Sequence, residues 1–125
     1  MAQPREPHTG GCGTVINPST GLKEFVVISG VGSDEVSTEI YNIDNDAWRY
    51  GPNYPLGEVE DAVVVQDALG SFYVIGGFQD EDDTFLDMIY RFDEDTYEFV
   101  EVDQRLPYNA SAMMGLMVER EIIGV

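Results

Sequence analysis

Ile40-Tyr41-Asn42-Ile43-Asp44-Asn45-Asp46-Ala47-Trp48 is followed, 49 residues later, by Ile89-Tyr90-Arg91-Phe92-Asp93-Glu94-Asp95-Thr96-Tyr97, a second version of the same pattern. Each version has an Ile-Tyr pair, an acidic turn and a final aromatic residue. A shorter match precedes each version, with Phe25-Val26-Val27-Ile28-Ser29-Gly30 before the first and Phe72-Tyr73-Val74-Ile75-Gly76-Gly77 before the second. Self-similarity at this spacing is typical of solenoids, propellers and other repeat architectures. We therefore expect two repeated units, each made of two linked β-hairpins.

Each unit contains four short apolar runs that are separated by clusters of turn-forming residues. The expected strands are residues 15–16, 25–28, 38–43 and a last strand with Trp48 and Tyr50 in the first unit, and residues 61–66, 72–75, 85–92 and 97–102 in the second. A third unit begins at residues 112–118. Helical periodicity of useful length does not appear, so the sequence predicts an all-β fold of four-stranded antiparallel sheets. A generic antiparallel sandwich is the alternative.

The chain is strongly acidic, with 24 Asp and Glu residues, 6 Lys and Arg residues and a formal net charge of −18. A field of this sign repels phosphate groups, so we do not expect nucleic acid or anionic membranes as partners. Cys12 is the only cysteine, and an internal disulfide is therefore impossible. Residues 1–10 hold no apolar run like that of a signal peptide. The chain as written thus predicts a cytoplasmic protein, or an extracellular one if the true start lies upstream.

Several of these features resemble the kelch repeat, the unit that forms the blades of kelch-type β-propellers. Arg5-Glu6-Pro7-His8 is similar to its Arg-x-x-His opening, and Gly76-Gly77 is similar to the glycine pair that ends its second strand. Gly11 to Gly13 and the turn at Asn17 to Gly21 resemble long-loop kelch variants of invertebrates. The positions that form the repeat motif in this sequence are His8, Gly30, Tyr41, Trp48, Gly76, Gly77, Tyr90 and Tyr97.

This resemblance implies an incomplete propeller of about two and a half repeats. Residues 1–7 form an N-terminal extension, 8–57 and 58–107 form two complete repeats, and 108–125 begin a truncated third repeat. We expect the chain to be a fragment of a larger propeller, or to complete a ring by self-association. Gly76 and Gly77 should adopt positive φ or allow close approach of the backbone. The aromatic rings should fill the space between adjacent blades.

The same resemblance implies a scaffold without catalysis, which binds a protein or peptide through loops on one face. The residues that we expect to form this partner-binding face are Arg5, Asp34, Glu35, Glu58, Gln79, Asp80, Glu81, Asp82, Asp83 and Asn109. Acidic side chains dominate this set, so a basic segment is the expected partner. A kelch-type propeller enzyme, and a structural module of a larger extracellular protein, are the alternatives.

The sequence does not predict a catalytic or metal site, and we expect no cofactor. Asp80 to Asp83 offer the oxygen ligands that calcium prefers. Consecutive carboxylates on an extended loop point in alternating directions, however, and the spacing of an EF-hand is absent. His8 is the only histidine, so a cluster of His and Cys ligands cannot be assembled. We interpret the acidic run as a solvated loop and His8 as a structural residue.

Overall fold

The computed structural model describes residues 1–4, 11–28, 37–79 and 81–108, and these residues form β-strands and turns without a helix. Sheet 1 consists of β1 (Cys12–Ile16), β2 (Lys23–Val27), β3 (Ser37–Asn42) and β4 (Ala47–Asn53). Sheet 2 consists of β5 (Val63–Gln66), β6 (Phe72–Ile75), β9 (Ile89–Asp93) and β10 (Glu98–Glu101). Both are antiparallel meanders, because each strand pairs with the next strand of its own sheet. The predicted all-β fold with four-stranded antiparallel sheets is thereby confirmed.

A short hairpin of β7 (Phe78–Gln79) and β8 (Thr84–Phe85) interrupts sheet 2 between β6 and β9. The sequence predicted one strand over residues 85–92, but Phe85 pairs back onto Phe78 and β9 begins only at Ile89. The rings of Phe78 and Phe85 lie 5.0 Å apart between centroids, so two aromatic side chains stabilise the hairpin. The predicted third repeat lies outside the described residues, apart from Tyr108.

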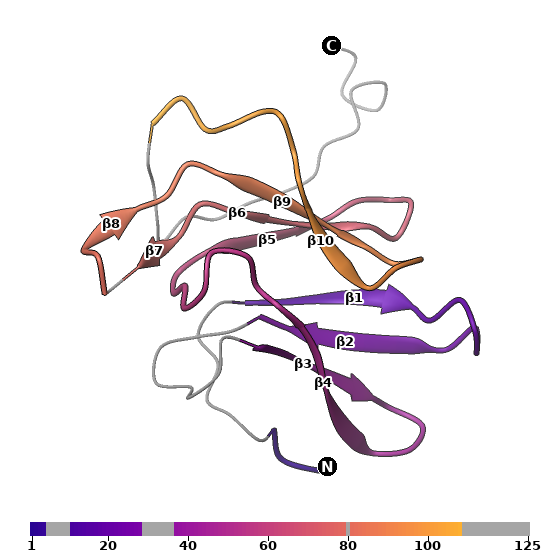
Figure 1. Ribbon diagram of the computed structural model, residues 1–125. Helices are drawn as coiled ribbons and strands as arrows, with labels where there is room; N and C mark the ends of the chain where they lie inside the picture. The colour runs from indigo at the N-terminus through magenta and orange to yellow at the C-terminus, as the bar shows by residue number, and fades with distance from the viewer. Residues whose placement is uncertain (5–10, 29–36, 80, 109–125) are drawn as a thin grey trace.

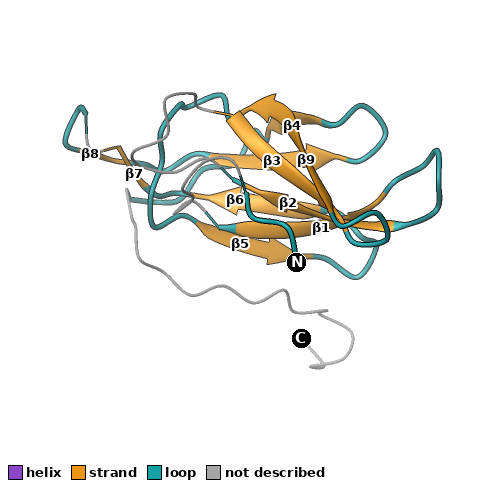
Figure 2. Ribbon diagram, turned by 90° about the horizontal axis from the view of Figure 1, so that it is seen from below, coloured by secondary structure: helices purple, strands orange, loops and turns teal. Residues whose placement is uncertain are grey.

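The two sheets stack face to face. Seen from below, β1 overlies β5, β2 overlies β6 and β3 overlies β9 (Figure 2), and β1 contacts both β5 and β6. The core between the sheets consists of Val15, Val26, Ile28 and Ile40 from sheet 1, with Phe72, Val74, Tyr90 and Phe92 from sheet 2. Tyr54, Val59 and Leu86 from the connections complete it. The ring of Phe72 lies directly on Gly13, where an added Cβ would stand 2.4 Å from the ring.

Each sheet carries a row of three aromatic side chains across neighbouring strands. In sheet 1 the register pairs Phe25 with Tyr41 and Tyr41 with Trp48, and in sheet 2 it pairs Phe72 with Phe92 and Phe92 with Phe99. We call these triplets the aromatic rows. Ring centroids are 6.4 and 5.0 Å apart in the first row, and 4.9 and 5.1 Å apart in the second. Cross-strand aromatic pairs of this kind stabilise antiparallel sheets.

The register differs by two residues from the repeat that the sequence indicated. Tyr90 lies opposite Glu101, and Tyr97 lies in the β9–β10 turn with a φ of 55°. They therefore do not occupy the positions of Tyr41 and Trp48. The turns cause this difference. The side chains of Asn42 and Asp93 each accept a backbone N–H group of the turn that follows, and this fixes the residue at which the preceding strand ends. These two residues are 51 positions apart, whereas the Tyr residues are 49 apart.

The meander topology gives the molecule two different ends. We call one the turn end, because it carries the four hairpin turns at residues 17–22, 43–46, 67–71 and 94–97. The other is the connection end, which carries residues 54–62, 76–79 and 81–88, including the β7–β8 hairpin. The turn end lies to the right of Figure 1 and the β7–β8 hairpin to the left. Within the described part of the chain there is no helix long and apolar enough to cross a membrane.

Candidate functional site

A pocket of about 210 Å³ opens at the connection end. The side chains and backbone that line it are Leu56, Gly57, Glu58, Gln79, Glu81 and Asp82. We call it the acidic pocket, because three of its described lining residues, Glu58, Glu81 and Asp82, are acidic and none of them is a cation. One wall is the connection between β4 and β5, and the other is the β7–β8 hairpin.

Backbone hydrogen bonds hold these two walls together. Glu60 N donates to Phe78 O over 3.0 Å, and Phe78 N donates to Glu60 O over 2.9 Å. The side-chain amide of Gln79 donates to the carbonyl of Leu56. Gly57 N donates to Tyr54 O over 2.9 Å, which closes the turn at the base of the wall. The hairpin is therefore anchored at a fixed position relative to the connection, although the two segments are far apart in the sequence.

The glycine pair has the backbone role that the sequence predicted. Gly76 and Gly77 adopt φ angles of 62° and 110° between β6 and β7. A Cβ added to Gly77 would lie 2.5 Å from a methyl group of Val59 and 3.1 Å from Glu60 O. Only glycine combines this backbone angle with such a close approach. The pair thus lets the chain turn out of β6 and pass closely beside the connection that forms the other wall.

Four of the predicted partner-binding residues come together at the acidic pocket, namely Glu58, Gln79, Glu81 and Asp82. Asp83 follows in the hairpin turn, exposed and with a φ of 50°. The remaining predicted site and motif residues, Arg5, His8, Gly30, Asp34, Glu35, Asp80 and Asn109, lie outside the described residues. Among the described side chains, His, Cys, Asp and Glu do not form a group of three that could hold a metal ion.

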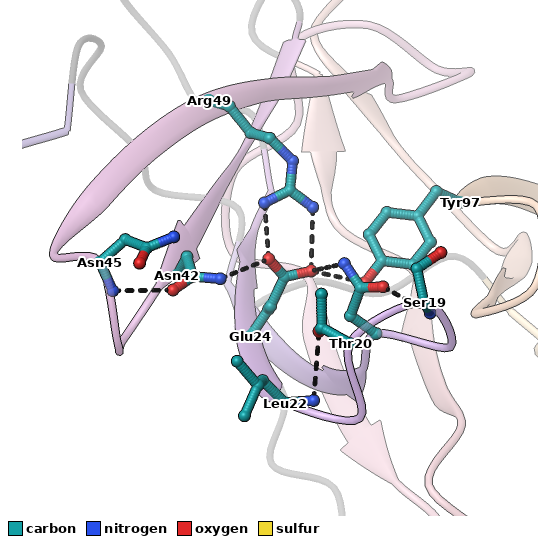
Figure 3. A network of polar contacts seen from close by, with 9 residues as sticks. Ser19, Thr20, Leu22, Glu24, Asn42, Asn45, Arg49 and Tyr97 are labelled. Atoms are coloured by element: carbon teal, nitrogen blue, oxygen red, sulfur yellow. Dashed lines mark hydrogen bonds and ion pairs between the residues drawn. The ribbon is translucent and has the colours of Figure 1, made fainter.

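A second polar cluster, which sequence reasoning missed, lies at the turn end around Glu24 (Figure 3). The Glu24 side chain is fully buried. Arg49 donates to both of its carboxylate oxygens, over 2.6 and 2.9 Å, and Tyr97 donates through its hydroxyl over 2.6 Å. The amides of Asn17 and Asn42 donate over 3.1 and 3.3 Å. Because Tyr97 lies in the β9–β10 turn of sheet 2, this network joins the turns of both sheets.

The electrostatics of the Glu24 network favour the charged carboxylate. The Arg49 hydrogen bonds, followed by those from Tyr97 and Asn17, lower the pKa of Glu24 to about 2 against the cost of its burial. Burial and the hydrogen bond to Glu24 raise the pKa of the Tyr97 hydroxyl. The guanidinium of Arg49 also lies 5.8 Å from the centre of the Tyr97 ring. Since Glu24 already neutralises Arg49, we interpret the network as a structural tie between the sheets.

The sequence contained one signal for this network. In β2 the side chains of Glu24 and Val26 lie on the same side, because alternate residues of a strand share a face. A carboxylate in such a position faces the core and must find a partner. The partner Arg49 lies on β4, two strands away, and Tyr97 lies in the other sheet. Those distances along the chain explain why the sequence alone did not identify the cluster.

The aromatic row of sheet 1 also contacts the N-terminal residues. Trp48 donates its indole N–H to Ala2 O over 2.9 Å, and Ala2 N donates to the carboxylate of Asp46 over 2.7 Å. The same carboxylate accepts from the hydroxyl of Tyr41, also over 2.7 Å. Tyr41 and Trp48 therefore pack against each other and are tied to the N-terminal residues within sheet 1, whereas their expected place between adjacent blades stays a prediction.

Neither the models of known protein families nor the curated proteins contain a match to this sequence. Function must therefore be inferred from the residues and the geometry. The acidic pocket is the feature that combines a hollow, a uniform charge and the predicted partner-binding residues.

Proposed function

We propose that this chain is a non-catalytic binding module that receives a basic segment of a protein partner in its acidic pocket. The observation that carries this proposal is the convergence of Glu58, Glu81 and Asp82 around one hollow of about 210 Å³. A hollow lined by carboxylates without a cation attracts Lys or Arg side chains. The apolar side chain of Leu56 in the same lining would contact the aliphatic stem of such a residue.

The charges of the pocket act mainly on the rate of association. Glu81 and Asp82 are exposed, and exposed charges steer the encounter but add little affinity each. The net charge of −18 extends the attraction beyond the pocket. This long-range attraction is screened within about 8 Å at physiological ionic strength. Binding of a basic segment should therefore be fast and should weaken as salt is added.

We further propose that the two sheets are blades of a kelch-type β-propeller. The stacking of two four-stranded meanders and the presence of one aromatic row in each support this interpretation. In such a propeller the connection end would form one face of the ring, so the acidic pocket would belong to a larger binding surface. The glycine pair beside the pocket fits the position at which the kelch repeat has one.

Fluorescence anisotropy with a labelled Lys- and Arg-rich peptide tests the binding proposal. The triple variant Glu58→Gln, Glu81→Gln, Asp82→Asn should bind about fivefold more weakly, because three rim charges each contribute about 0.3 kcal/mol. The matched control Asp44→Asn, Asp95→Asn, Glu98→Gln removes the same charge from exposed residues of the turn end. It should bind almost like the wild type. Equal binding by both triple variants would contradict the proposal and would indicate only nonspecific attraction by the net charge.

A further inference from the structure

The β7–β8 hairpin, which forms one wall of the acidic pocket, projects beyond the stacked sheets in both views (Figures 1 and 2). The edge of β7 that faces away from β8 is already paired, because Glu60 and Phe78 exchange two backbone hydrogen bonds there. Within the described part of the chain, β8 pairs with β7 alone. Thr84 is exposed, and Phe85 is 50% exposed. We call the unpaired side of β8 the open edge.

The backbone of Phe85 offers two hydrogen-bonding groups at the open edge. In an antiparallel pair, opposite residues alternate between those that exchange hydrogen bonds and those whose N–H and C=O point away from the partner strand. Leu86 N donates to Gly77 O over 2.9 Å. The next pair, Phe85 and Phe78, is therefore of the second kind. Phe78 directs its two groups to Glu60, and Phe85 directs its own to the opposite side, where another chain could pair with them.

The open edge is short and has defined limits. On the side towards β9, Asp87 O already accepts a hydrogen bond from Leu106 N over 2.8 Å. On the other side, Asp83 leaves the extended conformation with a φ of 50°. An added segment could therefore form one bridge opposite Phe85, with one further residue on each side. The bridge that Glu60 makes on the other edge of the hairpin has the same size.

The two faces of the hairpin differ in chemistry. Phe78 and Phe85 lie on one face, where their rings are in contact. Gln79 and Thr84 lie on the other face, because alternate residues of a strand point to opposite sides. The Gln79 side chain donates to Leu56 O, and both residues line the acidic pocket. One face of the hairpin is therefore aromatic, and the other adjoins the acidic pocket.

We propose that the basic segment of the partner adds to the open edge as an extended strand with the alternating pattern basic, apolar, basic. The apolar residue lies opposite Phe85 and contacts its ring, while its N–H and C=O pair with the Phe85 backbone. The basic residues on either side point to the other face, where Glu81 and Asp82 of the same hairpin supply the opposite charge. In strand addition of this kind, backbone hydrogen bonds give affinity and alternate side chains give specificity.

This inference rests on the proposed function, because it takes the same partner and adds how its backbone is held. Fluorescence anisotropy with labelled peptides that contain a central Lys-Phe-Lys triplet tests it. An N-methyl group on the Phe amide removes the N–H that would donate to Phe85 O. It should weaken binding about fivefold, because one backbone hydrogen bond is lost. The matched control carries the N-methyl group on the first Lys, whose N–H points away from β8, and should bind like the unmodified peptide.

A variant of the protein tests the aromatic contact. Phe85→Ala removes the ring and should weaken binding of the Lys-Phe-Lys peptide several-fold. The control Leu69→Ala removes an apolar side chain that is 89% exposed in the β5–β6 turn, and it should have no effect. Circular dichroism melts should show that both variants are folded. If Phe85→Ala is not, the N-methyl peptides still test strand addition on the wild type.

The outcomes separate this inference from the proposed function. Equal binding of the two N-methyl peptides would overturn strand addition. If the triple variant Glu58→Gln, Glu81→Gln, Asp82→Asn still weakened binding, the acidic pocket would remain the site of a differently held segment. The reverse result, in which only the N-methyl group on Phe matters, would support strand addition and contradict the role of the pocket charges. Absence of binding by all three peptides would overturn both proposals.

Discussion

Glu24 shows how one side chain can join two sheets. The alternation of β2 directs its carboxylate to the same side as Val26, so the charge is removed from water. A buried charge is unfavourable unless it is paired and hydrogen-bonded. Arg49 supplies the opposite charge in a two-point contact, and Tyr97 adds a donor from the other sheet. The stacking of the turns is thus coupled to the ionisation of one carboxyl group.

This coupling predicts that Glu24→Gln lowers the free energy of unfolding by an amount that depends on pH. The pKa of Glu24 falls from 4.5 to about 2 on folding, so its contribution is complete above pH 4.5 and is lost as pH falls towards 2. A shift of this size corresponds to about 3 kcal/mol of stability. Urea unfolding should show that the wild type is more stable than Glu24→Gln near neutral pH, and that this difference falls by about this amount as the pH decreases from 4.5 towards 2.

The exposed substitution Glu98→Gln provides the control, because it removes the same charge outside the network. It should change stability little at any pH. A difference between wild type and Glu24→Gln that is equally large at pH 7 and pH 3 would contradict the account, since it would not arise from ionisation of Glu24.

At the scale of the elements, turn-forming residues determined most of what the sequence could predict. Residues 72–75 were predicted as a strand and form β6, and the glycine pair after them has the predicted positive φ angles. Tyr90 was predicted to match Tyr41, but Phe92 does so in the structure. Tyr41 and Tyr90 are 49 positions apart, whereas Asn42 and Asp93, which fix the turns, are 51 positions apart. The pairing of the strands in the two sheets matches the spacing of Asn42 and Asp93.

The acidic pocket was predictable in part. The resemblance to the kelch repeat selected Glu58 and the loop from Gln79 onward, and the structure brings these segments to one hollow. The pairing of Glu60 with Phe78, which creates the two walls, could not be read from the sequence. Contacts between segments this far apart depend on how the connection folds back across the end of the sheet. Periodicity and turn residues do not contain that information.

The close approach of the two walls of the acidic pocket predicts that two glycine substitutions destabilise the fold to different extents. Gly77→Ala combines a positive φ with an overlap with Val59, whereas Gly70→Ala has a positive φ of 98° and nothing within 4 Å. The backbone cost should be similar, about 1–2 kcal/mol. Overpacking should add about 1–3 kcal/mol for Gly77→Ala alone. Thermal melts should therefore show Gly77→Ala as clearly the less stable variant, and equal melting temperatures would refute the close approach of the walls.

At the scale of the whole molecule, the two ends have different properties. The turn end contains a buried network in which Arg49 neutralises Glu24, and its remaining carboxylates, such as Asp44 and Asp95, are exposed on separate turns. The connection end gathers carboxylates around a hollow without a cation among the described lining residues. The stacked sheets keep these ends apart, as Figure 1 shows. A charged partner is therefore expected at the connection end.

NMR mapping of backbone amide chemical shifts during titration with the Lys- and Arg-rich peptide tests the assignment of the binding site directly. The largest changes should occur at Gly57, Glu58, Gln79, Glu81 and Asp82, and they should saturate together. Amides of the turn end, such as Asn45 and Asp95, should change little. Changes that are spread evenly over both ends, or that are centred on the turn end, would contradict the assignment of the acidic pocket as the binding site.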